Sequence, residues 1–172
     1  MTPLQAGSRY GQYFGLLLVA AGLALKLSGT PHGSWQGYAL YALMPVAVLA
    51  ALFGFQHINK EAPGFLQALG AGIAASVVAG ALFALFIYVY HGFYDDTLLL
   101  MLVEHAREDL VREGLGEQQV NQAMLEVQAA RSPGNFALAS FARMAVVGVA
   151  TAVLFAPVCG IAKSRERRRR LR

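Results

Sequence analysis

Two cations, Lys26 and Arg143, are the residues whose type and setting in the sequence could support binding chemistry. Each stands at the end of a long uncharged run that is apolar enough to enter a membrane. A charge is costly to place in hydrocarbon, so a cation at such a position is a candidate for binding an anion. The nineteen residues after Arg143, 144–162, are uncharged and correspond to about 28 Å of helix. The pattern predicts that both cations lie at one membrane surface, where a pocket for a phosphate or a lipid headgroup is one interpretation.

The same two cations also have structural interpretations. A Lys or Arg at the end of a membrane helix extends its charged group to the interface and anchors the helix. Three acids follow the third apolar run and are alternative partners for the cations, namely Asp95, Asp96 and Glu104. From the sequence alone the pocket, the anchors and the ion pairs remain open.

No other side chains have the spacing of a catalytic or metal site. Four histidines are scattered along the chain, and no two of them are spaced as ligands on one helix. His91 stands among aromatic residues and is interpreted as part of an interfacial aromatic belt. One cysteine excludes an internal disulfide and a cysteine cluster, and the apolar runs contain no Asp or Glu for a proton relay. We therefore predict no cofactor, no bound metal and no enzymatic activity.

The elements that must position these residues are membrane helices. Hydrophobic residues make up 56% of the 172-residue chain and charged residues only 14%, whereas a soluble domain usually has about a quarter charged residues. We therefore predict an all-α membrane protein, with one integral membrane domain over residues 1–172. Turn residues at 29–34 predict a loop, and Pro45 predicts a kink in the second span. The four transmembrane helices are expected at about residues 10–28, 36–56, 65–91 and 136–162.

Small residues form a stripe along the third span, which lies in thirty uncharged residues, 65–94. They recur at every fourth position, which on a helix makes a shallow groove for a neighbouring helix. The stripe consists of Ala68, Gly72, Ser76, Gly80 and Ala84, and a matching stripe in the fourth span consists of Gly148, Ala152, Ala156 and Gly160. We predict that the stripes pack the two spans together, or alternatively that they form a homo-oligomer.

The hydrophilic insertion, residues 95–131, predicts an amphipathic helical hairpin between the third and fourth spans. Asp95 and Asp96 are candidates to cap its first helix, and Gly114 is a candidate to end it. Apolar residues recur at helical spacing in both halves of the insertion. Their apolar face is expected to rest on the partner helix, on the membrane surface or on another protein.

The distribution of Lys and Arg predicts the orientation. With four spans both chain ends lie on one side, where Arg9, Lys60 and seven cations of the tail make nine, against five on the other side. Cytoplasmic loops carry the excess of Lys and Arg, so both termini are predicted to be cytoplasmic. The hairpin, with eight acids and three cations, is then extracytoplasmic, which is the periplasm in a Gram-negative bacterium. The basic tail, residues 163–172, is interpreted as a cytoplasmic anchor on anionic lipids and not as a nucleic-acid site.

The order of these parts resembles the bacterial membrane family named domain of unknown function 4199. The resemblance rests on the segment IYVYHGFYDD that leaves the third span, the charged helical insertion, and the basic end of the last span. The turn Gly114-Leu115-Gly116-Glu117 and the Ser132-Pro133 pair before the last span are also similar to the family pattern, although Gly116 stands where a Ser or Thr cap is expected. The resemblance implies the four-span architecture and no activity or catalytic residue.

These observations predict a multi-pass protein of the bacterial inner membrane that acts as a non-enzymatic accessory or assembly partner. Its expected partners are membrane lipids and another membrane or periplasmic protein. The alternative is a small carrier that handles lipid or phosphate headgroups through Lys26 and Arg143.

Overall fold

The computed structural model describes residues 1–28 and 40–170, with side chains up to residue 164. These residues form six α-helices and one 3₁₀ turn, with no strand among them. The elements are α1 (Pro3–Leu27), η1 (Leu40–Ala42), α3 (Leu43–Asn59), α4 (Phe65–Phe93), α5 (Thr97–Arg112), α6 (Glu117–Ala130) and α7 (Pro133–Arg170). Four segments are long and apolar enough to cross a membrane, namely α1, η1 with α3, α4, and the part of α7 up to Ser164. The all-helical class predicted from the sequence is therefore confirmed, whereas the predicted loop at 29–34 and the predicted start of the second span lie outside the described residues.

Helix α1 begins at Pro3, before the apolar run from residue 10 on which its prediction was based. The Gln5 backbone N–H donates to Thr2 Oγ1 at 3.2 Å, and the Thr2 N–H donates to Gln5 Oε1 at 3.0 Å. This reciprocal capping, with Pro3 in the first turn, satisfies backbone donors that would otherwise be exposed at the helix start. The polar residues 3–9 are therefore helical too.

The predicted kink at Pro45 is not an interior break of α3. Pro45 is the third residue of α3, whose first turn has no intrahelical acceptor for a backbone N–H. The helical geometry changes earlier, at η1. Pro157 is the proline that lies inside a long helix, in α7, and it leaves the Val153 carbonyl without its usual helical donor.

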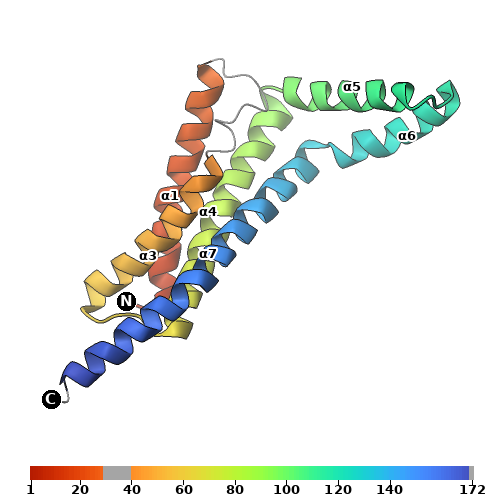
Figure 1. The fold of residues 1–172 in the computed structure, drawn as a ribbon. Coiled ribbons are helices and arrows are strands. Elements are labelled where there is room, and N and C mark those ends of the chain that lie inside the picture. Colours follow the sequence, from red (N-terminus) through yellow and green to blue (C-terminus); the bar gives the residue numbers. More distant parts are fainter. Residues whose placement is uncertain (29–39, 171–172) are drawn as a thin grey trace. The chain divides into compact units, whose positions relative to one another are not determined.

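The chain divides into two compact units, Met1–Phe83 with Phe141–Arg172, and Ala84–Ser140. In the first unit α1, α3, the beginning of α4 and the long C-terminal part of α7 pack side by side (Figure 1). Gly7 contacts Ala71 and Gly15 contacts Ala79, so α1 and α4 run in the same direction.

Helices α3 and α7 run opposite to α1 and α4. Gly54 of α3 lies under the Tyr10 ring of α1, while the Asn59 side-chain amide, at the end of α3, donates to the Met1 carbonyl oxygen at 3.2 Å. Gly160 near the end of α7 lies against Phe65, the first residue of α4. The starts of α1 and α4 and the ends of α3 and α7 therefore share one end of the first unit.

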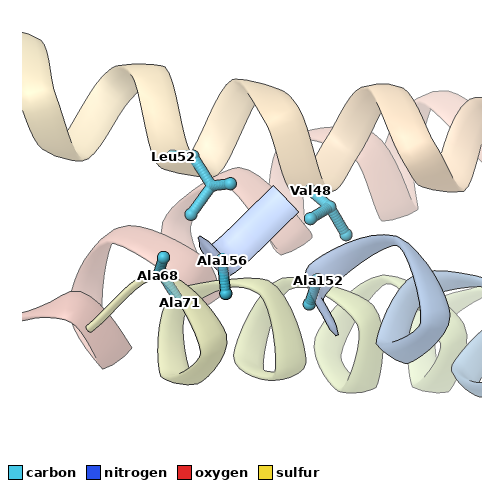
Figure 2. Close-up of a cluster of buried hydrophobic side chains, with 6 residues drawn as sticks. All are labelled: Val48, Leu52, Ala68, Ala71, Ala152 and Ala156. Carbon is cyan, nitrogen blue, oxygen red and sulfur yellow. The ribbon is translucent and has the colours of Figure 1, made fainter. Parts of the chain in front are cut away.

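Small side chains dominate the buried core where α3, α4 and α7 meet. Val48 and Leu52 of α3 point toward alanines of the other two helices (Figure 2). These alanines are Ala68 and Ala71 of α4 and Ala152 and Ala156 of α7. With one-carbon side chains in the contact, two backbones approach more closely than Leu or Ile would allow.

The second unit contains α5 and α6, which contact each other. Gly114 ends α5 with φ +80°, and its N–H donates to the Val111 carbonyl at 3.0 Å while the Leu115 N–H reaches the Leu110 carbonyl at 3.4 Å. This pair of bonds is the Schellman arrangement, which favours glycine at the left-handed position. The predicted helix end at Gly114 is therefore confirmed.

Both helices of the insert contain buried apolar residues. Leu99 of α5 is 5% exposed, and Val120 and Met124 of α6 are also buried. At least part of the apolar face of each helix is thus covered.

Candidate functional site

Helix α4 contacts α7 through residues of both small stripes. Gly148 lies against Ser76, whose Oγ and Cβ occupy the space that a Gly148 side chain would need. A Cβ added at Gly72 would lie 3.2 Å from Val48 Cγ1 of α3 and would also meet Ala152 of α7. At Gly80 an added Cβ would lie 3.4 Å from Met144 Cβ. These glycines allow an approach that a larger residue would prevent.

A third stripe, in α1, was missed by the sequence reasoning. A Cβ added at Gly11 would lie 2.7 Å from the Ala75 carbonyl oxygen, and one added at Gly15 would lie 2.8 Å from Leu82 Cδ1. Gly7 makes the same kind of contact with Ala71. The signal was present as glycine at every fourth position, 7, 11 and 15, but part of it precedes the apolar run. Helix α4 therefore meets α1 on one face, and α7 together with α3 on another.

These contacts also fix the levels of the two candidate cations in the first unit. Gly15 lies against Leu82, and Gly80 lies against Met144, so Gly15 of α1 and Met144 of α7 share a level. Arg143 is the neighbour of Met144, whereas Lys26 lies eleven residues beyond Gly15 on α1, or about 16 Å further along the helix. A single headgroup bound to both cations would have to bridge this offset.

The environments of the two cations differ as well. The Arg143 side chain is exposed on α7, and it forms no ion pair or hydrogen bond with another described residue. Lys26 is half-buried and has an interaction partner. The structure thus presents Arg143 as an outward-facing cation and Lys26 as one already engaged.

The buried hydroxyl groups are bonded within their own helices. The side chains of Ser76, Ser140 and Thr151 are at most 7% exposed. Each hydroxyl donates to the carbonyl oxygen four residues earlier, at 2.8, 2.9 and 2.8 Å respectively. In this arrangement the hydroxyl satisfies its own donor without a partner from another helix.

His91 is the buried imidazole of the second unit, with 2% of its surface exposed. Its Nδ1 lies 2.9 Å from the Asp95 carbonyl oxygen, and since a carbonyl only accepts, Nδ1 carries the hydrogen. The ring packs edge-to-face with Tyr90 at a centroid distance of 5.3 Å and with Phe136 at 5.5 Å. His91 therefore links the end of α4 to the corner before α5 and to the start of α7.

Asp95 completes this corner with both its backbone and its carboxylate. Its N–H donates to the Tyr90 carbonyl at 3.0 Å, and its Oδ1 accepts from the Thr97 N–H at 3.1 Å. Asp96 occupies the N-cap position of α5 but makes no capping bond with its side chain. Of the two predicted caps, Asp95 therefore supplies the hydrogen bond.

In the first unit, polar side chains also lie near the end that contains the starts of α1 and α4. Lys163 Nζ of α7 donates to Gln67 Oε1 of α4 at 3.1 Å, and the same oxygen accepts from the Gly64 N–H at 2.9 Å. The Arg9 guanidinium of α1 bonds to the Tyr13 hydroxyl at 3.1 Å and lies 5.8 Å from the centre of its ring. Three basic residues, Arg9, Lys60 and Lys163, thus belong to the end shared by the starts of α1 and α4.

No group of three or more His, Cys, Asp or Glu side chains that could hold a metal ion occurs in the part of the chain that the structure describes.

One known protein family matches most of the chain. The family model described as protein of unknown function, DUF4199, matches residues 9–159. The chain belongs to the DUF4199 family. No curated protein and no solved structure matches this DUF4199 chain significantly. The match runs from Arg9 in α1 to Cys159 in α7, and so includes Gly11 and Gly15 of α1, the insert and Arg143.

Proposed function

We propose that this protein crosses the bacterial plasma membrane four times and acts, without catalysis, as an accessory or assembly partner of another protein. The membrane location in this proposal rests on the positions of the large apolar side chains. The core of the first unit contains many alanines and glycines, whereas large side chains face outward, with Leu16 61%, Leu66 77% and Leu154 72% exposed. Water disfavours so much exposed apolar surface, but lipid accommodates it.

The proposed orientation places both termini in the cytoplasm. Successive helices α1, α3, α4 and α7 alternate in direction, as four consecutive crossings require. Arg9, Lys60 and Lys163 lie at the end where α1 starts, and cytoplasmic ends carry the excess of cations. A reporter fused after residue 172 should be active only in the cytoplasm, and one inserted between α5 and α6 only outside it. Reporters active in the same compartment would refute four crossings.

The insert, proposed to be an extracytoplasmic helical hairpin of α5 and α6, is the candidate surface for a partner protein. Met101 of α5 is 48% exposed and Leu125 of α6 is 69% exposed, although both are apolar. A photo-crosslinking amino acid at these positions should crosslink a second protein in native membranes. A matched probe at Leu16, on the outward face of α1, should crosslink lipid. Crosslinks from the insert only to lipid or to the same chain would contradict the proposal.

The alternative role as a headgroup carrier depends on Lys26 and Arg143. Both cations belong to the first unit, but they lie on levels about 16 Å apart along the helices. The carrier role predicts that replacing both residues by Gln abolishes binding of an anionic lipid or a polyprenyl phosphate. Unchanged binding in the double variant would exclude this role.

A further inference from the structure

Arg143 is a single charge inside the longest of the four apolar segments found among the described residues. Between Arg131 and Lys163 it is the one residue with a charged side chain. The segment Pro133–Ser164 is long and apolar enough to cross a membrane, and Arg143 is its eleventh residue. Uncharged helix therefore continues on both sides of Arg143.

The contacts of the first unit place Arg143 deep with respect to α1. Arg143 shares its level with Gly15, which lies within the uncharged residues 10–25 of α1. The next charge of α1 in the outward direction, Lys26, is about 16 Å further along. A bilayer that covers residues 10–25 of α1 therefore also covers the level of Arg143.

At this level Arg143 faces away from the bundle. It is exposed and makes no ion pair or hydrogen bond with any described residue. On the same face of α7, Val146 is 68% and Leu154 is 72% exposed, with the small residue Ala150 between them. The spacings of three, seven and eleven residues from Arg143 align these side chains as one helical stripe. This stripe has the form of a surface for one further helix.

An unpaired guanidinium within hydrocarbon is costly, so the occupant of this surface has to supply a negative charge. A second copy does not supply it in the membrane, because the four apolar segments of this chain contain no Asp or Glu. With the outer surface at the level of Lys26, a lipid phosphate there would lie about 16 Å from the level of Arg143, which is longer than an Arg side chain. A carboxylate on a neighbouring transmembrane helix meets Arg143 at its own depth.

We propose that Arg143 and the stripe Val146, Ala150 and Leu154 dock a transmembrane helix of another protein that carries a carboxylate. This inference rests on the proposed membrane location and assembly role. It adds that the partner has a carboxylate within its transmembrane helix.

The first experiment measures depth. A fluorophore on a cysteine at position 143 or at position 26, in a Cys159→Ser chain, is quenched by lipids that carry nitroxides at different depths. We expect the label at 143 to be quenched by mid-chain nitroxides and the label at 26 by headgroup nitroxides. Equal headgroup depth for both labels would overturn the inference and leave the four-span topology intact. If no lipid nitroxide quenches the label at either position, the membrane location itself is overturned.

The second experiment measures charge recognition with the full chain in phosphatidylcholine bilayers. The probes are synthetic single-span Leu/Ala helices with one Glu, one Gln or one Lys at the depth of residue 143. Association is followed by energy transfer to a dye in the α5–α6 insert. We expect the Glu helix to bind about tenfold more tightly than the Gln helix, as for a polar contact between membrane helices.

Variants of the chain test whether the preference for the Glu helix depends on the charge of Arg143. R143Q should remove the preference for the Glu helix, and R143E should transfer it to the Lys helix. R9Q is the matched control, because Arg9 is an exposed cation of the same unit that already bonds to Tyr13, and it should change nothing. Equal binding of the Glu and Gln helices would overturn the inference, as would an equal loss in R9Q. Mixed phosphatidylcholine–phosphatidylglycerol bilayers supply the last control. If phosphatidylglycerol gathers around the unaltered chain but not around R143Q, and the Glu helix is not preferred, Arg143 binds a lipid phosphate and the inference is overturned.

Discussion

Gly148 of α7 lies directly against Ser76 of α4, and the Ser76 side chain fills the space that a Cβ on Gly148 would occupy. The Ser76 hydroxyl donates to the Gly72 carbonyl of its own helix at 2.8 Å. The two helices are therefore held close by the absence of a side chain, and the Ser76 donor is already satisfied. In lipid such close approach is a main source of helix association.

Gly148→Ala should destabilise the protein by about 1–3 kcal/mol, because the new methyl group overlaps Ser76. Thermal and chemical unfolding in detergent micelles measure this loss. The control is the same change in a Ser76→Gly background, where the remaining contact, with the Cα of residue 76 at 3.5 Å, is an ordinary one. The cost of Gly148→Ala should there be largely removed. An equal cost in both backgrounds would show that the contact does not limit the packing.

Gly11→Ala tests the contact between α1 and α4. An added Cβ would lie 2.7 Å from the Ala75 carbonyl oxygen, and a backbone atom cannot rotate away, so we expect a loss of about 1–3 kcal/mol. Gly70→Ala is the matched control in α4, because nothing lies within 4 Å of its added Cβ. It should be neutral or stabilise the helix by up to about 1 kcal/mol. Similar unfolding temperatures for the two variants would argue against the α1–α4 contact.

Lys60→Gly should stabilise the chain by about 1 kcal/mol. Lys60 follows α3 in the left-handed conformation with φ +54°, which crowds the Cβ of any residue except glycine. Lys60→Gln removes the charge and keeps the Cβ, so it separates conformation from electrostatics and should give no gain. A rise in unfolding temperature that Lys60→Gln reproduces would assign the effect to charge.

His91→Phe should loosen the corner between α4 and α5. Phe keeps a ring for the packing against Phe136 but leaves the Asp95 carbonyl without the donor at 2.9 Å, at a cost of about 1–3 kcal/mol. Hydrogen exchange should accelerate at Thr97 and the following amides of α5. Tyr90→Phe, which removes the longer hydroxyl contact with Asp95 Oδ2 at 3.4 Å, should have a smaller effect. Unaltered exchange in His91→Phe would show that the hydrogen bond is dispensable.

Several local features follow from sequence because they depend on nearby residues. Gly114 ends α5 as predicted, since its left-handed φ favours glycine in any fold. Four apolar helical segments likewise overlap the predicted ones, because the apolar character of a segment depends on hydropathy, whereas the start of α1 depends on its cap. The position of Pro45 was predicted less well, since a proline in a first turn and one in a helix interior look alike until the helix start is known.

The sequence alone therefore determined the helical class, the four apolar segments and the charged insert, all of which depend on composition and short-range spacing. Only the tertiary structure decided that α4 contacts α1 through Gly11 as well as α7 through Gly148, that His91 is buried, and that Arg143 and Lys26 lie on different levels. The physical reason is that, in a chain of apolar helices, the surfaces facing lipid and the surfaces facing a neighbour have the same hydrophobicity. Hydrophobic periodicity then no longer identifies the buried face, and which helices meet, and at what level, depends on shape.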